Sequence, residues 1–159
     1  MTAMKTMTSS QVAERSEALF QQGFCCAESV LQAIAESRGI QSELIPKIAT
    51  GLCGGIGRTG GVCGAVSGGV LGINQVAGRN HPSQSPDDNH RLVRHSLAQF
   101  ERQFGTITCE RLIGCRSDTP EGQQFFKENK LREQKCQGFV KEAAEMASAI
   151  IEQAAPRRT

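Results

Sequence analysis

The chain has 159 residues, enough for one domain, and a chain of this size buries about 68 to 70% of its unfolded surface on folding. Its formal net charge of +2 is too small to indicate a nucleic-acid-binding protein, and without Trp or Tyr it lacks a platform for stacking bases. The N-terminal stretch MTAMKTMTSS lacks the apolar core of a signal peptide, and no later stretch approaches the ~20 apolar residues of a membrane span. We therefore expect a cytoplasmic protein that neither binds nucleic acid nor inserts into a membrane.

Apolar residues recur at helical spacing along nearly the whole chain, and no segment shows sustained strand alternation. The first predicted helix runs from Ser10 to about Gln22, with Ser9 or Ser10 as its N-cap. The second begins near Cys26 and ends at Gly39. The residues predicted to face inward are Val12, Leu19 and Phe20 in the first helix and Cys26, Val30, Leu31 and Ile34 in the second.

The middle of the chain predicts a short helix, a glycine-rich loop and two longer helices. The short helix spans 42–50, with a proline near its first turn. After the loop, a helix begins at about Val62. The next helix follows a turn-rich connection, is capped by Asp87 or Asp88 and ends before Gly105.

Three more helices complete the prediction. They are the short segment CERLIG after Thr108, the segment TPEGQQFFKENK capped by Thr119, and a final helix that begins near Cys136. The expected fold is an all-α, single-domain compact bundle in which the glycine-rich loop leads into a central helix. The expected division is a flexible N-terminus at 1–8, a helical domain at 9–153 and a polar C-terminal tail at 154–159.

The seven cysteines are the most informative residues, because structural disulfides are rare in the cytosol and an odd number cannot all pair. Four of them fall in the first turn of a predicted helix and on its apolar stripe: Cys26, Cys63, Cys109 and Cys136. Backbone N–H groups and the helix dipole at such positions are expected to lower the pKa of a thiol and favour the thiolate. Four such sulfurs could hold an iron–sulfur cluster, hold zinc, or cycle between dithiol and disulfide.

The glycine-rich loop has two interpretations. Gly55, Gly57 and Gly60 satisfy the pattern GxGxxG, but no strand precedes them, which argues against a dinucleotide site. We expect instead that the glycines permit tight turns around the sulfurs and that backbone N–H groups there donate to a thiolate or to cluster sulfide. On this ground Gly64, next to Cys63, is a candidate cofactor-binding residue.

Three cysteines remain outside this set. Cys25, beside Cys26 but off the apolar stripe, is expected to have no role, whereas Cys53 and Cys115 could serve as resolving thiols. The close C-x(2 to 4)-C pairs of zinc fingers and the thioredoxin motif are absent from the chain. Any site must therefore be assembled by tertiary structure.

Several blocks of the sequence resemble those of a family of redox-active proteins named for its pattern, C_GCAxxG_C_C. The blocks are GFCCAESVL, GGIGRTGGVCGAVSGG, FGTITCERLIG with TPEG, and KCQGFV. The resemblance places the family's motif cysteines on the four helix-start cysteines named above, which we call the motif cysteines. The family is also similar to the non-haem part of split-Soret cytochromes, which implies iron–sulfur chemistry over zinc, while the absence of CxxCH argues against a c-type haem.

The leading hypothesis is that the motif cysteines bind an iron–sulfur cluster and pass electrons to an unidentified redox partner. The first alternative is a thiol–disulfide oxidoreductase or redox sensor without metal, in which Cys63 attacks and a second core cysteine such as Cys26 resolves. The second alternative is a metal-stabilised interaction module, which could be a homodimer.

Overall fold

The structure is a computed structural model that describes residues 6–154, and within that range it is all-α, as expected. The parts of the predicted N-terminus and tail at 1–5 and 155–159 lie outside the described residues. The α-helices are α1 (Ser9–Gln21), α2 (Cys26–Ser37), α3 (Gly64–Ala77), α4 (Asp87–Phe104), α5 (Cys109–Ile113), α6 (Pro120–Glu128) and α7 (Gln137–Ala154). A 3-10 helix, η1 (Lys47–Leu52), and a π-helical turn, η2 (Arg132–Cys136), complete the elements.

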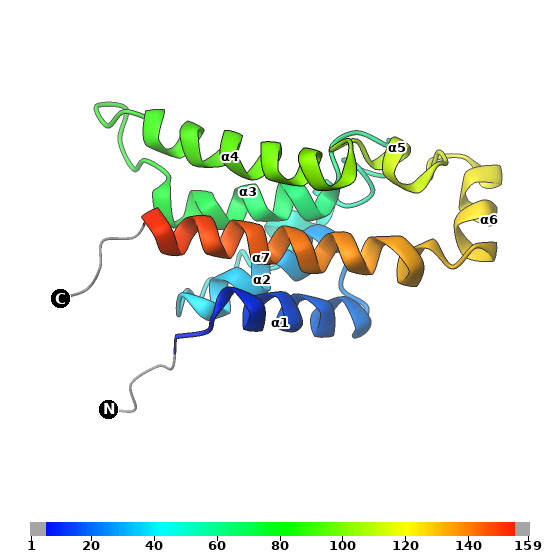
Figure 1. The fold of residues 1–159 in the computed structure, drawn as a ribbon, viewed down its shortest axis with the longest axis horizontal. Coiled ribbons are helices and arrows are strands. Elements are labelled where there is room, and N and C mark those ends of the chain that lie inside the picture. The colour runs from blue at the N-terminus through cyan, green and yellow to red at the C-terminus, as the bar shows by residue number, and fades with distance from the viewer. Residues whose placement is uncertain (1–5, 155–159) are drawn as a thin grey trace.

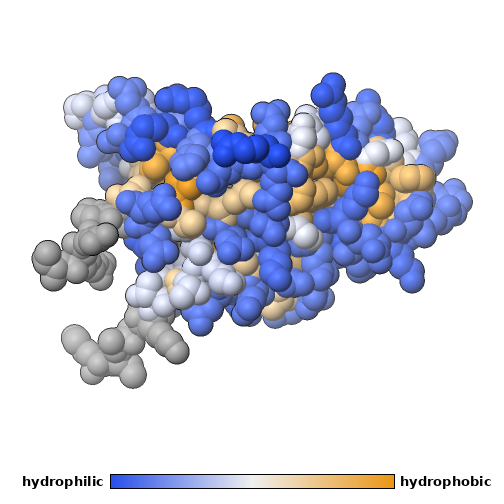
Figure 2. Space-filling model, in the orientation of Figure 1, coloured by the Kyte–Doolittle hydropathy of each residue, from blue (hydrophilic) through white to orange (hydrophobic). Residues whose placement is uncertain are grey.

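The long helices lie side by side as a bundle, and the two short helices α5 and α6 stand at one end of it (Figure 1). Helix α7 packs against α1, α2, α3 and α4, while α3 packs against α2, α4 and α7. The core therefore lies around α3 and α7, which confirms the prediction of a central helix after the glycine-rich loop. In the view of Figure 2 the surface is largely hydrophilic, with apolar residues gathered in part toward the end that carries α5 and α6.

The core is formed by the apolar stripes that the periodicity predicts. Val12, Val30 and Ile34 are fully buried, as is Val140 in the apolar stripe of α7. Three aromatic rings, those of Phe100, Phe104 and Phe139, pack at tilted or edge-on angles with centroids 4.7 to 6.0 Å apart. Among the described residues, no helix is both long enough and apolar enough to cross a membrane.

Glycines in α3 allow it to approach α2 closely. A Cβ added at Gly68 would lie 2.7 Å from the carbonyl oxygen of Ala27 and 3.0 Å from the Cβ of Val30. We expect Gly68→Ala to lower the free energy of unfolding by about 1 to 3 kcal/mol, although alanine favours helix, because the neighbours include backbone. Gly138→Ala in α7, where nothing lies within 4 Å of the added Cβ, should instead stabilise by about 0.5 to 1 kcal/mol. Chemical denaturation of the two variants measures this difference, and equal effects would contradict the packing argument.

Two of the predicted helix caps are wrong. Helix α1 is capped by Thr8, whose hydroxyl accepts from the Gln11 N–H at 3.1 Å while the Gln11 side chain accepts from the Thr8 N–H. In α4, Pro86 occupies the N-cap position, and Asp87 and Asp88 lie in the first turn, where their charges still favour the helix dipole. The predicted caps of α6 by Thr119 and of α4 by Gly105 at its C-terminus are confirmed.

The predicted helix over 42–50 is also wrong. The chain forms turns up to Pro46, and only then the 3-10 helix η1, which Pro46 precedes as N-cap. The physical reason is that proline disfavours the α conformation at the residue before it, so a helix cannot run through Ile45 into Pro46.

Candidate functional site

A cavity of about 1190 Å³ opens at the end of the bundle where the glycine-rich loop, α5 and η2 meet the start of α2 and α3. Six of the seven cysteines line it: Cys25, Cys26, Cys53, Cys63, Cys109 and Cys136. We call it the cysteine cavity. The structure thus brings the four motif cysteines to one place, as the convergence of the apolar stripes predicts.

Backbone pairing holds Cys63 beside Cys109. The Cys63 N–H donates to the carbonyl of Ile107 at 2.7 Å, and the Cys109 N–H donates to that of Gly61 at 2.7 Å, around a single antiparallel bridge between Val62 and Thr108. Cys63 is the N-cap residue of α3, and Cys109 is the first residue of α5. The end of the glycine-rich loop therefore delivers two thiols to neighbouring helix starts.

The loop itself depends on glycine at Gly55. This residue has φ = 71°, and a Cβ there would lie 2.8 Å from the Cβ of Cys109 and 2.5 Å from the N atom of Gly61. Only glycine satisfies both the left-handed backbone and the close approach. The expectation that the loop glycines permit tight turns around the sulfurs is consistent with this geometry.

Cys26, the first residue of α2, lies against the start of α3. The backbone N–H groups of Gly54 and Ala27 donate to its sulfur. A Cβ added at Gly64 would overlap this sulfur and would lie 3.1 Å from the carbonyl oxygen of Leu52. The Gly64 backbone is thus in direct contact with a motif cysteine, although no hydrogen bond from it to sulfur is found.

Cys136 is not at the start of a helix, in contrast to the prediction. It is the last residue of the π-helical turn η2, which runs directly into α7. The boundary was misplaced because the helical segment already begins at Leu131, five residues earlier. Single π-turns within helices are frequent at functional sites, and this one turns Cys136 toward the cavity.

Burial raises the pKa of every motif cysteine, which overturns the expectation that helix N-termini lower it. The pKa of Cys63 rises to about 12 and that of Cys109 to about 11, mainly because burial disfavours the charged thiolate. The same cause raises the pKa of Cys26 and of Cys136. Backbone N–H groups of Ala65 and Val66 lower the pKa of Cys63, but by less than burial raises it.

The motif cysteines also act on one another. The charges of the other three motif cysteines contribute to the raised pKa of Cys136, and the charge of Cys26 contributes at Cys63 and Cys109. Four thiolates in this cavity would therefore repel each other strongly unless a positive group joined them.

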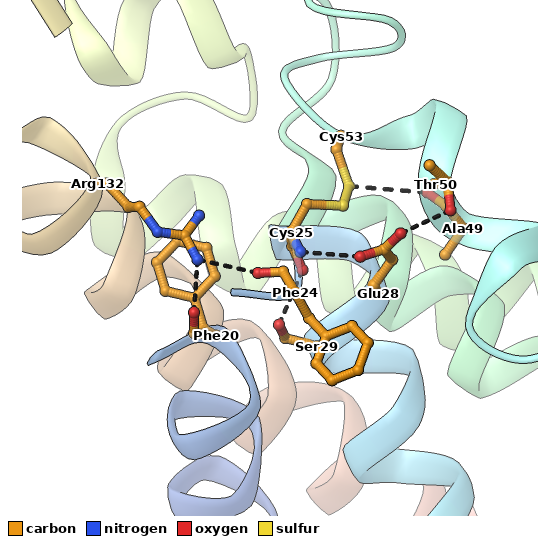
Figure 3. The surroundings of a disulfide bond; sticks show 9 residues. All are labelled: Phe20, Phe24, Cys25, Glu28, Ser29, Ala49, Thr50, Cys53 and Arg132. Carbon is orange, nitrogen blue, oxygen red and sulfur yellow. Dashed lines mark hydrogen bonds between the residues drawn. A yellow bond between two sulfur atoms is a disulfide. The ribbon is translucent and has the colours of Figure 1, made fainter. Parts of the chain in front are cut away.

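Arg132 is a site residue that no sequence pattern indicated. Its guanidinium lies over the ring of Phe20, 3.7 Å from the centroid, and donates to the carbonyl oxygens of Phe20 and Phe24, the latter at 3.0 Å (Figure 3). Its positive charge partly offsets the rise in the pKa of Cys26 and of Cys136 that burial causes. Arg132 thus joins η2 to the end of α1 and brings a cation to the motif cysteines.

Cys25 is not without a role, because it forms a disulfide with Cys53 across 28 residues of sequence, with Cα atoms 6.1 Å apart. The Glu28 side chain lies beside this bond (Figure 3) and accepts from the Cys25 N–H at 2.9 Å and from the Thr50 hydroxyl at 2.6 Å. It thereby ties the start of α2 to η1. Cys115, the other predicted resolving thiol, is free, and it is not among the residues that line the cavity.

The raised pKa values predict unusual pH dependence for the reduced, metal-free protein. Alkylation of Cys63 and Cys109 should be slow near pH 8 and should keep rising about tenfold per pH unit to about pH 10, where free cysteine has levelled off. Mass spectrometry of the alkylated peptides measures this. A plateau near pH 9 would contradict the raised values.

The same shifts predict how stability depends on pH. The folded protein retains protons on these thiols that the unfolded chain releases near its ordinary pKa, so stability is full below about pH 8.5 and falls as pH rises toward 11 to 12. Denaturation midpoints of the reduced, metal-free protein at successive pH values test this, and a midpoint unchanged to pH 10.5 would contradict it.

Among residues 6–154, no three His, Cys, Asp or Glu side chains are arranged to hold a single metal ion. A mononuclear zinc site needs ligand sulfurs about 2.3 Å from one ion, which draws them close together. The motif cysteines are near enough to influence one another's charge, yet they do not meet this condition.

The structure is an all-α bundle with a cysteine-lined cavity, and the cysteines of this site come from several different helices. The sequence pattern of one family, described as "Putative redox-active protein (C_GCAxxG_C_C)", matches residues 24–150. The chain belongs to this family. No curated protein and no solved structure gives a significant match.

Proposed function

We propose that the protein is an electron carrier in which the motif cysteines Cys26, Cys63, Cys109 and Cys136 hold an iron–sulfur cluster. The observation that carries this proposal is that all four thiols line one cavity. They lie close enough for the charge of Cys26 to contribute to the raised pKa of each of the other three. A buried set of mutually repelling thiolates is stable only around a positive group, and iron is bound by cysteine in this manner.

The residues present suit such a group. Sulfur ligands of a cluster accept hydrogen bonds that tune its potential, and backbone N–H groups of Gly54 and Ala27 reach Cys26 while those of Ala65 and Val66 reach Cys63. Arg132 adds a positive charge beside Cys26 and Cys136. When bound, a cluster would supply the capacity to take up and release single electrons, and these residues would orient its ligands.

Zinc is the weaker candidate. No three side chains in the described part of the chain are arranged around a single ion, as a zinc site requires. A metal-free relay led by Cys63 is also weaker, since a thiol with a pKa of about 12 carries almost no thiolate at neutral pH. The redox partner, a cytoplasmic location and a homodimer remain predictions.

The test is an absorption spectrum from about 300 to 700 nm of anaerobically purified protein, with iron, zinc and acid-labile sulfide assayed on the same sample. Without Trp or Tyr the protein background is low. Broad absorption near about 400 nm with matching iron and sulfide is the expected result. A colourless protein that remains free of iron after anaerobic reconstitution with iron and sulfide would overturn the proposal, and stoichiometric zinc whose removal unfolds the helices would favour the interaction module.

A further inference from the structure

We propose that the Cys25–Cys53 disulfide is a second redox centre, which exchanges with external thiols that carry negative charge and enter through the cysteine cavity. Both residues line this cavity. Both are only half-buried, whereas Cys63 and Cys109 are 6% and 8% exposed. Of the cysteines at the site, this pair is therefore more open to a reagent than Cys63 or Cys109, and the reaction requires no bound metal.

The disulfide joins two backbone segments that touch the same motif cysteine. Cys25 directly precedes Cys26, and Cys53 directly precedes Gly54, whose N–H donates to the Cys26 sulfur. Opening the bond removes the covalent link between the start of α2 and the glycine-rich loop and leaves Glu28 as the remaining side-chain tie to Thr50. The state of this disulfide thus bears directly on the surroundings of Cys26.

The charge of the cavity indicates the class of thiol. Four cations line it, Arg58, Lys127, Lys130 and Arg132, against two carboxylates, Glu28 and Glu133. The cavity volume of about 1190 Å³ is large enough for a small organic molecule. A low-molecular-weight thiol with carboxylate groups therefore matches both its charge and its size.

The reaction is an ordinary thiol–disulfide exchange in two steps. The external thiolate attacks one sulfur of the Cys25–Cys53 pair, the new S–S bond forms there, and the Cys25–Cys53 bond breaks with its electron pair going to the other sulfur, which takes up a proton. A second external thiolate attacks the external sulfur of the mixed disulfide and releases the protein cysteine, which is also protonated. Two external thiols are oxidised to one disulfide, and Cys25–Cys53 is reduced to two thiols.

The test equilibrates the full chain in a series of reduced and oxidised glutathione buffers, followed by acid quenching, alkylation and fragment mass spectrometry that separates Cys25 from Cys26. The pair should pass from oxidised to reduced within the series, with helicity retained by circular dichroism. A bond that stays oxidised throughout, or opens only as the helices unfold, would overturn the proposal. Iron is assayed on the same samples. Absence of iron would contradict the cluster proposal alone, and failure of the disulfide to exchange would contradict this proposal alone.

Two further measurements test the exchange and the substrate class. Rapid quenching should trap glutathione as a mixed disulfide on Cys25 or Cys53, with the alkyl group on the other cysteine of the pair, and glutathione found only on other cysteines would overturn the proposed exchange. Compared at equal thiolate concentration, anionic glutathione should react several-fold faster than cationic cysteamine at low salt, with the difference lost at high salt. Equal rates at low salt would overturn the charge argument. Cys115→Ser, which changes a thiol outside the cavity, should react as the unmodified chain does.

Discussion

Replacing Cys63 by Ser is expected to remove most of the iron from anaerobically purified protein and to leave its helical signal largely unchanged. Cys63 is the most buried of the motif cysteines at 6% exposure, and it is influenced by both Cys26 and Cys109. A serine hydroxyl is a much poorer ligand for iron than a thiolate. The backbone bond from residue 63 to Ile107 does not involve the side chain, so the local fold should persist.

The matched control for this substitution is Cys115→Ser. Cys115 is also a free thiol and lies near Cys109, but it is half-buried and lies outside the cavity lining. It should retain full iron and sulfide, measured with the absorption spectrum of the same sample. Undiminished iron in Cys63→Ser would show that Cys63 is not a ligand, and equal loss in both variants would point to general damage to the protein.

The second large effect is expected from Gly64→Ala. The added Cβ would overlap the Cys26 sulfur and lie 3.1 Å from the Leu52 carbonyl oxygen and 3.2 Å from the Cys53 Cα. Two of these three atoms are backbone, which cannot move aside as a flexible side chain does. We expect a loss of unfolding free energy on the order of 3 kcal/mol and, because Cys26 is displaced, loss of most of the iron.

Gly72→Ala is the control that separates these two effects. It crowds the same pair of helices about two turns further along α3, where the nearest atoms all belong to the Ile34 side chain, so it should lower stability while iron stays bound. Denaturation and iron assays on both variants decide the matter. If Gly64→Ala is destabilised but keeps its iron, the close approach of Gly64 to Cys26 matters only for packing.

Much of the fold follows from local periodicity. Apolar spacing of three and four residues is a property of the sequence alone, and it correctly predicts α1, α2, α3, α4, α5 and α6 to within about two residues at most ends. Where the prediction failed, a local feature competed with the pattern. Pro46 prevents a helix from beginning at residue 42, so η1 begins only at Lys47. Thr8, and not Ser9 or Ser10, is the N-cap of α1.

The candidate site was only partly predictable. The motif cysteines could be selected because the sequence places each on an apolar stripe near a predicted helix start. The structure brings all four into one cavity, including Cys136 at the end of η2. Arg132 could not be selected, since its contact with Phe20 joins residues 112 positions apart. The Cys25–Cys53 bond likewise joins segments whose proximity no local pattern encodes.

The sequence by itself determined the all-α class, the set of motif cysteines and the family, because helical periodicity and motif order depend only on the order of the residues. The tertiary structure alone decided the chemical state of those cysteines. A helix start favours the thiolate through a few local N–H groups, but desolvation depends on every atom packed around the sulfur. Here the packing of α2, α3, α5 and η2 makes burial the larger effect, so the thiols of Cys63 and Cys109 stay protonated at neutral pH.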